Sequence, residues 1–222
     1  MKELAPGLFQ LGGFPPNGFN AYLMGGVLVD SATNLGHRRI LRQLKGHTVE
    51  AHALTHAHPD HQGSSRRICE AIGVPYWVGA ADADAAESGD LSGAMPSGFM
   101  SKFSQKAFAG PGHPVSRRLV EGDEVGGFQV LETPGHSPGH VAFWRASDRV
   151  LVQGDVVFGM NPFTGIPGLR PPFDFFTRDI SENRRSAQRL AELEPALVCF
   201  GHGPAMRDTQ KFVSFVRDKM RP

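Results

Sequence analysis

Cysteine is scarce in this sequence: its 222 residues include only two, Cys69 and Cys199, which lie 130 positions apart. They fall in segments that we expect to be a helix and a buried strand, so we expect two reduced core thiols and no disulfide framework.

An excess of charge of one sign is missing as well, because the chain has 23 Lys and Arg and 22 Asp and Glu, which gives a net charge of +1. This balance argues against the strongly basic surface of a protein that binds duplex nucleic acid.

Long apolar runs are also absent. Hydrophobic residues make up 40% of the chain, but they never form a run of about 18 that could span a membrane, and the opening MKELAPGLF has no apolar stretch typical of an export signal. We therefore expect a soluble, cytoplasmic protein with neither a membrane nor a nucleic acid as its partner. At this length roughly 70% of the unfolded chain's surface can be buried, so the fold needs no metal for stability and any metal can serve chemistry.

Short apolar runs punctuated by glycine predict strands, and amphipathic stretches predict helices. The expected strands are at 8–11, 21–24, 27–29, 49–54, 74–78, 127–131, 141–144, 150–152 and 196–200. The expected helices are at about 35–44, 64–72, 178–193 and 208–219, the second one capped by serines and ended by Gly73. Because strands and helices alternate in two similar halves, we expect a single α/β domain of residues 1–222 with two sheets inside and helices outside.

Residues 82–114 interrupt this pattern with Gly, Ser, Pro and Met and with spaced aromatics. Met95, Phe99, Met100 and Phe103 recur at a spacing that gives one apolar stripe on a helix. The segment is either a surface insertion with a small core of its own or a lid over a cleft, since long irregular segments in compact domains are commonly lids. A second loop, 158–176, is rich in Pro, Gly and Phe and leaves the same two alternatives open.

The segment THAHPDHQG, residues 55–63, carries the strongest chemical signal. A shuffled sequence of this composition would contain its H-x-H-x-D-H pattern with a chance on the order of one in a thousand. In an extended segment alternate side chains point the same way, so His56 and His58 can bind one ion. Pro59 ends that extension and allows a helix to begin, so Asp60 and His61 can point to a second ion. The alternative is a solvated polar turn.

Three later segments share another pattern, an apolar run followed by glycine and then by histidine or aspartate. They are ETPGHSPGH with His136, VLVQGD with Asp155 and LVCFGHG with His202. Each is a weak signal alone, but together with the first motif they give seven nitrogen and oxygen ligands at the carboxyl ends of predicted strands. Seven ligands are enough for two metal ions and a bridging carboxylate.

The remaining histidines carry weaker signals. His140 follows His136 by four positions, and we expect it either to support a ligand, to face the substrate, or to be a plain turn residue. The others have no expected partner and should lie at the surface: His37, His47, His52 and His113.

The order of these motifs resembles the metallo-β-lactamase-fold superfamily of hydrolases over nearly the whole chain. The resemblance implies an αββα sandwich of two mixed β-sheets flanked by helices, with a dinuclear metal site at one edge. It also implies one set of three ligands for each ion, with Asp155 bridging the two: His56, His58 and His136 for the first ion, and Asp60, His61 and His202 for the second.

Two features narrow the expected branch of the family. Asp155 stands where metallo-β-lactamases usually have Cys or Ser, so β-lactam hydrolysis is expected only as a side activity. The phrases TPGHSPGH and GHGP look more like glyoxalase II and general hydrolases of the fold. Only 20 residues follow His202, fewer than the helical C-terminal domain of glyoxalase II needs, so glutathione thioesters are not the expected substrates.

The resulting hypothesis is a metal-dependent hydrolase that cleaves a thioester, ester or lactone of a small molecule. Hydroxide held between two divalent ions would attack the carbonyl; Zn²⁺ is the expected metal, with Fe or Mn as alternatives. Asp60 and His140 are the catalytic candidates, with Asp60 as the proton shuttle. The alternatives are a mono-iron redox enzyme similar to persulfide dioxygenases and a non-catalytic scaffold. Whether the chain forms a homodimer is left open.

Overall fold

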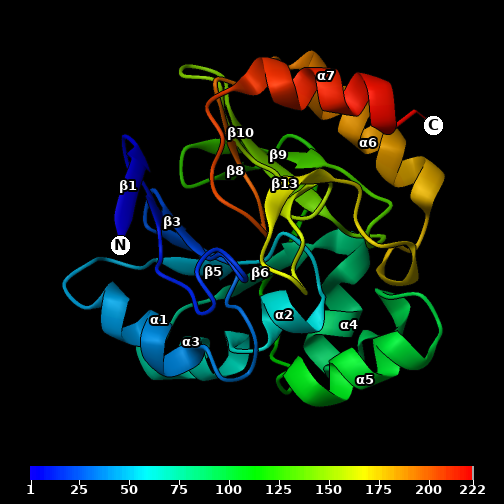
Figure 1. The fold of residues 1–222 in the computed structure, drawn as a ribbon. Helices are drawn as coiled ribbons and strands as arrows, with labels where there is room; N and C mark the ends of the chain where they lie inside the picture. Colours follow the sequence, from blue (N-terminus) through cyan, green and yellow to red (C-terminus); the bar gives the residue numbers. More distant parts are fainter. Residues whose placement is uncertain (222) are drawn as a thin grey trace.

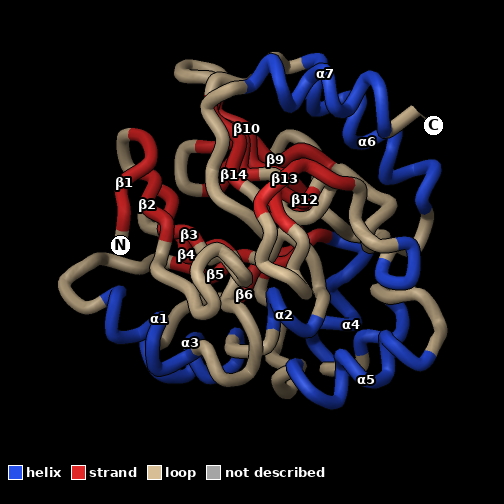
Figure 2. Tube along the Cα trace, in the orientation of Figure 1, coloured by secondary structure: helices blue, strands red, loops and turns tan. Residues whose placement is uncertain are grey.

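Two β-sheets lie at the centre of the molecule, and helices cover the outer face of each sheet (Figure 1). The computed structural model describes residues 1–221 of the chain. The helices are α1 (His37–Leu44), α2 (Pro59–Gln62), α3 (Ser65–Ile72), α4 (Ala83–Ser88), α5 (Phe99–Phe108), α6 (Ile180–Glu192) and α7 (Thr209–Lys219). Figure 2 shows the same layers, with α6 and α7 on one side of the strands and the other helices on the opposite side.

The first sheet is built from the first half of the chain. Its strands follow one another in space as in sequence: β1 (Lys2–Ala5), β2 (Leu8–Gln10), β3 (Tyr22–Met24), β4 (Val27–Val29), β5 (Ala51–Ala53), β6 (Tyr76–Gly79) and β7 (Arg117–Leu119). The strands pair antiparallel from β1 to β4 and parallel from β4 to β7, so the sheet is mixed.

The second sheet is built from the second half of the chain. Its spatial order is β14 (Leu197–Cys199), β11 (Val150–Val152), β10 (Val141–Arg145), β9 (Phe128–Glu132) and β8 (Glu124–Val125). Only the β11–β14 pair is parallel, so this sheet is mixed as well. A separate hairpin, β12 (Phe158–Met160) and β13 (Pro167–Arg170), follows β11. The αββα sandwich implied by the family resemblance is confirmed.

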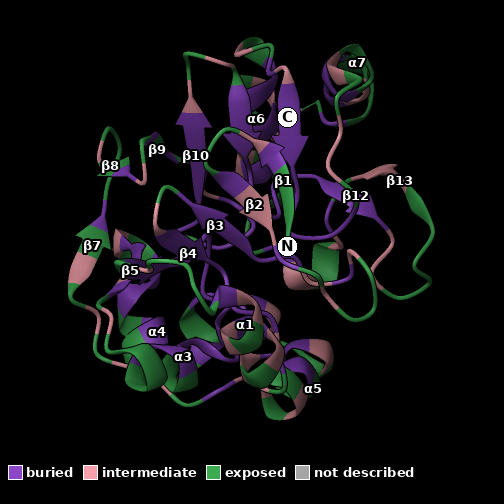
Figure 3. Ribbon diagram, turned by 90° about the vertical axis from the view of Figure 1, so that its left-hand side faces the viewer, coloured by how far each residue is buried: buried purple, intermediate pink, exposed green. Residues whose placement is uncertain are grey.

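Both faces of the central strands are buried, which explains their continuous apolar sequences. In β4, Val27 and Val29 face the second sheet, whereas Leu28 packs among Ile40 of α1 and Ile68 of α3. Side chains alternate between the two faces of a strand, so a three-residue apolar run serves two cores. Figure 3 shows these strands as buried and the outward surfaces of the helices as exposed.

Most predicted elements are present, with ends shifted by at most two residues. Gly73 ends α3 in the left-handed conformation (φ 69°), and its N–H donates to the carbonyl of Cys69, as expected. The prediction that a serine caps the start of α3 is wrong. The hydroxyl of Ser64 donates to the carbonyl of Thr33 and makes no capping hydrogen bond to the helix.

The elements that the sequence did not indicate are α4 and five strands: β1, β7, β8, β12 and β13. These strands contain two to four residues, too few to display alternation. Residues 82–114 hold α4, a short 3₁₀ helix (Leu91–Gly93) and α5. Cys69 and Cys199 are free and buried, in α3 and β14. Within residues 1–221, no helix combines the length and the apolar character needed to cross a bilayer.

Candidate metal centre

Four loops bring the seven predicted ligands together where strands of both sheets end. His56 and His58 follow β5, and α2 carries the next two residues of the motif. The loops after β9, β11 and β14 supply His136, Asp155 and His202. In the last loop Gly201 allows a close approach, because a Cβ there would lie 2.1 Å from Oδ1 of Asp155. A larger residue before His202 would displace the carboxylate.

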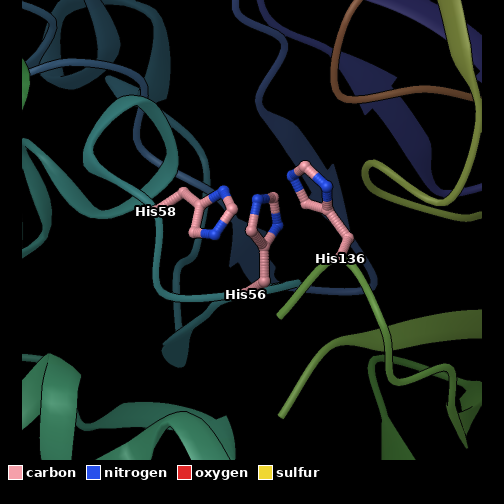
Figure 4. A group of neighbouring side chains, drawn as sticks. All are labelled: His56, His58 and His136. Carbon is pink, nitrogen blue, oxygen red and sulfur yellow. The ribbon is translucent and has the colours of Figure 1, made fainter. Parts of the chain in front are cut away.

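Six of the seven side chains form two groups of ligand size, and Asp155 links the two because it groups with His56 of one and His61 of the other. The potential ligand atoms within each group all lie within 4.8 Å of one another. The groups are His56, His58 and His136 on one side, and Asp60, His61 and His202 on the other. Figure 4 shows the three imidazoles of the first group side by side, with ring centroids 4.5 to 4.9 Å apart.

Asp155 lies between the two groups. Its Oδ2 is 3.1 Å from Nε2 of His202 and 3.2 Å from Nε2 of His61. The same oxygen is 3.6 Å from Nε2 of His136 and 3.8 Å from Nε2 of His56. A carboxylate in this position is placed to contact an ion in either group.

The buried polar atoms of this centre fit a cation. Among the described residues, Nε2 of His56, Nε2 of His61 and Oδ1 of Asp155 are buried and have no hydrogen-bond partner. An unsatisfied buried polar atom costs about 1–3 kcal/mol. Three of them in one centre indicate that the donor set is built for metal ions, and imidazole and carboxylate suit zinc, iron and manganese.

The hydrogen bonds on the far sides of the rings fix which nitrogen faces the centre. Nε2 of His58 lies 3.2 Å from the carbonyl of Ala94, and Nδ1 of His202 contacts the carbonyl of Gly18. A carbonyl can only accept, so these nitrogens carry a proton, and the opposite nitrogen of each ring is the one available to an ion. His58 therefore presents Nδ1 to the centre, and His202 presents Nε2.

Threonines do the same for two other rings. Nδ1 of His136 lies 3.2 Å from Oγ1 of Thr177, which donates its own proton to the carbonyl of Phe173. Nδ1 of His56 lies 3.0 Å from Oγ1 of Thr55, which donates its proton to Asp30. Each ring thus donates through Nδ1 and presents Nε2 to the centre. Outer partners of this kind orient ligands and raise their basicity.

Two buried carboxylates, which no motif in the sequence indicated, support the ligand loops. Asp30, just after β4, accepts from Nδ1 of His61 at 2.9 Å and from the backbone N–H of Thr55 at 2.8 Å. Asp82 accepts from the backbone N–H groups of Ala57 at 2.9 Å and Gly139 at 2.7 Å. Asp82 therefore ties the loop of the first two histidines to the loop of His136.

His140 lies behind Asp155. Its Nε2 accepts a hydrogen bond from the backbone N–H of Asp155 at 3.1 Å, and its Nδ1 lies 2.8 Å from Oγ1 of Thr133. Burial lowers the pKa of His140 to about 3, so the ring is neutral and can accept. The structure therefore places this residue where it can position Asp155.

The expectation that His52 lies at the surface is wrong. Its side chain is fully buried between the carbonyl of Leu28 and the hydroxyl of Ser65.

Burial and charge act in opposite directions on the ligands. Burial lowers the pKa of His56 and His136 well below the usual value. Burial alone would also lower the pKa of His202, but the carboxylates of Asp155 and Asp60 raise it to about 10. The pKa of His61 is raised in the same way by Asp155 and Asp30. An ion that binds to His61 and His202 must therefore displace their protons.

A cavity of about 250 Å³ opens onto the centre. Its walls come from both segments singled out in the sequence: 82–114 contributes Met95, Met100, Phe103, Ser104 and Phe108, and 158–176 contributes Phe158, Pro162, Phe163 and Phe176. Phe99, which was expected in the same stripe, does not line the cavity and is 80% exposed. Whether the 82–114 segment moves as a lid stays a prediction.

Comparison with known proteins agrees with this geometry. The family model described as the metallo-beta-lactamase superfamily matches residues 16–202. The chain is 29% identical over 150 residues to "Probable metallo-hydrolase YybB" of Bacillus subtilis, covering 68% of this chain and 62% of YybB. It is 30% identical over 201 residues to "Probable metallo-hydrolase YflN" of the same organism, covering 81% of this chain and 76% of YflN.

One solved structure and one shorter match add chemical detail. The crystal structure of TTHA1623 in a di-iron-bound form has a TM-score of 0.67 and 32% identity, covering 92% of this chain and 94% of that one. A stretch of 58 residues is 45% identical to hydroxyacylglutathione hydrolase of Rhodospirillum rubrum, and the match covers 23% of each chain.

Proposed function

Because the chain belongs to the metallo-beta-lactamase superfamily, we propose that it is a hydrolase with two metal ions that cleaves an acyl bond of a small molecule. The bond is a thioester, an ester or a lactone. The observation that carries the proposal is the pair of three-residue groups around Asp155, with three buried atoms that lack a partner. The short match to a hydroxyacylglutathione hydrolase supports acyl chemistry.

Each of the two three-residue groups would hold one of the two ions. His56, His58 and His136 would hold the first ion, and Asp60, His61 and His202 the second, with Asp155 between them. Bound divalent ions supply Lewis acidity and lower the pKa of water from 15.7 to about 7. Zinc is the metal we propose; iron is the alternative, because TTHA1623 was solved with two irons.

The chain's own side chains orient the substrate and move protons. The carboxylate of Asp60 lines the cavity, with 22% of its side chain exposed, so it can reach a leaving group and pass a proton to it. His140 holds the backbone of Asp155 in place. The aromatic walls of the cavity exclude water from the reacting carbonyl.

The test is hydrolysis of acetyl thioesters, acetyl esters and small lactones by the zinc-loaded and iron-loaded protein. At least one substrate should be hydrolysed only when metal is present. Asp60→Asn should lower turnover by about 10² or more. An Asp84→Asn variant, which changes an exposed aspartate, should match the parent protein. Hydrolysis that survives complete removal of metal would contradict the proposal.

The mono-iron redox alternative makes a different forecast. It requires a single iron on a ligand set of the His56, His58 and Asp155 type and no role for the second group. The three residues of the second group nevertheless lie within ligand distance of one another, which favours the hydrolase. Persulfide oxidation by the iron-loaded protein, with uptake of oxygen, would reverse that preference.

A further inference from the structure

We propose that the substrate enters the cavity with a neutral, apolar group, about the size of one aromatic ring, and that no ionic contact anchors it. This inference rests on the proposed hydrolysis, and it concerns the part of the substrate next to the reacting carbonyl.

The chemistry of the cavity wall leads to this assignment. Of the sixteen residues that line the cavity, ten are Phe, Met or Pro and one is Ser104. The other five are candidate ligands: His58, Asp60, His136, Asp155 and His202. No lysine or arginine of the described chain lines the cavity. Away from the candidate ligands, a carboxylate or phosphate on the entering group would therefore lose its hydration without gaining a partner, which is strongly unfavourable.

The basic residues nearby point elsewhere. Lys102 and Lys106 of α5 line a separate, open surface hollow together with Asp90. Met100 and Phe103, on the same helix, line the cavity. The guanidinium of Arg178 donates to the carbonyl of Met95 at 3.0 Å and so supports the wall from outside. The helix thus turns its apolar side to the cavity and its charged side away.

The α5 wall is fixed at both ends. Before α5, the carbonyls of Ala94 and Met95 accept from His58 and Arg178. At the last residue of α5, the carbonyl of Phe108 accepts from the backbone N–H of Asn34 at 2.9 Å, and just after the helix the carbonyl of Gly110 accepts from Gln62 at 3.1 Å. An apolar wall held in this way is preformed, so an apolar group binds without the cost of ordering it.

The opposite wall is an aromatic cluster. The ring of Phe158 packs edge-on against His202, with centroids 4.8 Å apart, and against Phe173 at 6.0 Å. Phe163 in turn contacts Phe173 at 5.1 Å. Drug-sized ligands occupy pockets of about 300–1,000 Å³, and this cavity is about 250 Å³. A single aromatic ring or a branched alkyl group fits that size class, and edge-on contacts suit an aromatic ring.

The experiment compares three thioesters of N-acetylcysteamine, which differ only in the acyl group: acetyl, phenylacetyl and succinyl. On the metal-loaded protein, kcat/KM for phenylacetyl should exceed kcat/KM for succinyl at least tenfold. Phe103→Ser should lower the phenylacetyl value about tenfold and change the acetyl value less than twofold. Phe103 is 53% exposed, so its replacement leaves the core intact.

Two further variants sharpen the comparison. Phe99→Ser removes an equal ring from the same helix outside the cavity and should leave the selectivity unchanged. Met100→Lys places an ammonium group in the wall. It should lower the ratio of kcat/KM for phenylacetyl to kcat/KM for succinyl at least tenfold. Equal rates for phenylacetyl and succinyl, or equal effects of the Phe99 and Phe103 variants, would overturn the inference while leaving the hydrolase proposal intact.

If none of the three thioesters is hydrolysed, the thioester form of the proposed function fails, and binding then decides the inference separately. Calorimetry on the metal-loaded protein would compare neutral phenylacetamide with anionic succinamate. Tighter binding of phenylacetamide that is lost in Phe103→Ser supports the inference, and tighter binding of succinamate overturns it.

Discussion

Asp30 is the residue on which both halves of the candidate metal centre depend. It contacts His61 of the second group directly, and through Thr55 it orients His56 of the first group. It has a positive φ of 59°, unusual for a residue other than glycine, at the end of a buried strand. One carboxylate therefore sets the ring orientation of a ligand to each ion.

Asp30→Asn should weaken metal binding at both positions. The carboxylate accepts from the N–H of Thr55 and from Nδ1 of His61 with different oxygens. An amide has only one acceptor oxygen, so one of these two hydrogen bonds is lost. The expected loss of metal affinity is about 10–100-fold, measured by competition with a chromogenic chelator. Asp84→Asn is the matched control, since Asp84 is exposed and pairs with Arg118 at the surface. Unchanged affinity in Asp30→Asn would show that the orientation does not matter.

His52 should make stability depend on pH. Burial lowers its pKa to about 4, whereas in the unfolded chain it is close to 6.5. The unfolded state thus binds the proton more tightly, so this contribution is complete above pH 6.5 and is lost as the pH falls toward 4. The loss is about 3 kcal/mol in the free energy of unfolding, measured by urea denaturation at several pH values.

His52→Gln is the comparison for this prediction, because it removes the titrating group. The difference in stability between the two proteins should shrink as the pH falls from 7 to 4. Parallel curves for His52→Gln and the parent protein would refute the assignment.

Helix α5 is the element that decides the shape of the cavity, and its position depends on contacts far away in the sequence. Asn34 binds the end of α5 through its backbone N–H and through its amide, which lies 3.4 Å from the carbonyl of Ala107 and 3.3 Å from that of Ala109. The backbone contact stays when the side chain is removed, so the two contributions can be separated.

Asn34→Ala should loosen α5 without unfolding the protein. Losing these long hydrogen bonds should lower the free energy of local opening of α5 by about 1 kcal/mol. That change corresponds to roughly fivefold faster hydrogen exchange in the peptides that cover residues 99–110. Gln43→Ala is the control, because it removes an amide that binds Gly12, far from α5. In this variant, hydrogen exchange in residues 99–110 should not change. Equal exchange in both variants would mean that the Asn34 amide adds nothing.

The sequence predicted the elements that carry strong local patterns and missed those defined by tertiary contacts. Glycine at 73 and periodic apolar residues were enough for α3 and for the central strands. Strand β7, with two arginines in three residues, has no pattern of its own and exists because β6 pairs with it. The expected stripe is divided in the structure: Met95 lies before α5, and of the three residues on the helix Met100 and Phe103 line the cavity whereas Phe99, at its first position, does not.

The candidate ligands were predictable for a related reason. The ligands from His56 to His61 form a dense local motif. The other three, His136, Asp155 and His202, each come directly after a glycine that follows a strand. Asp30 and Asp82 are each 25 positions from the loop that they support, and nothing near them marks a function. Their role depends on which strand ends lie next to each other, and that information exists only in the folded sheet.

At the scale of the whole molecule, each ion would connect the two sheets. The first group joins two histidines from the first sheet's half to His136, and the second group joins Asp60 and His61 to His202. Because the ligands must be folded to converge, metal binds the native state far better than the unfolded chain, and it stabilises by mass action.

Metal analysis by mass spectrometry should therefore find close to two ions per chain, and His202→Ala should lower that number to about one. Removing the metal with a chelator should lower Tm by about 5–10 °C, since saturation at 100 times Kd is worth about 2.7 kcal/mol and a chain of this size shifts about 2–4 °C per kcal/mol. A stoichiometry of one that His202→Ala leaves unchanged would count against the second position.

The division of the chain between the sheets has a consequence for protein engineering. A cut in the turn at 120–123, between β7 and β8, separates the first sheet from the second without interrupting either. Each fragment would then carry only part of each ligand set, so neither could assemble a complete site. The two fragments would behave as subunits of a heterodimer whose association strengthens with metal concentration, which is the property required of a split reporter for free zinc.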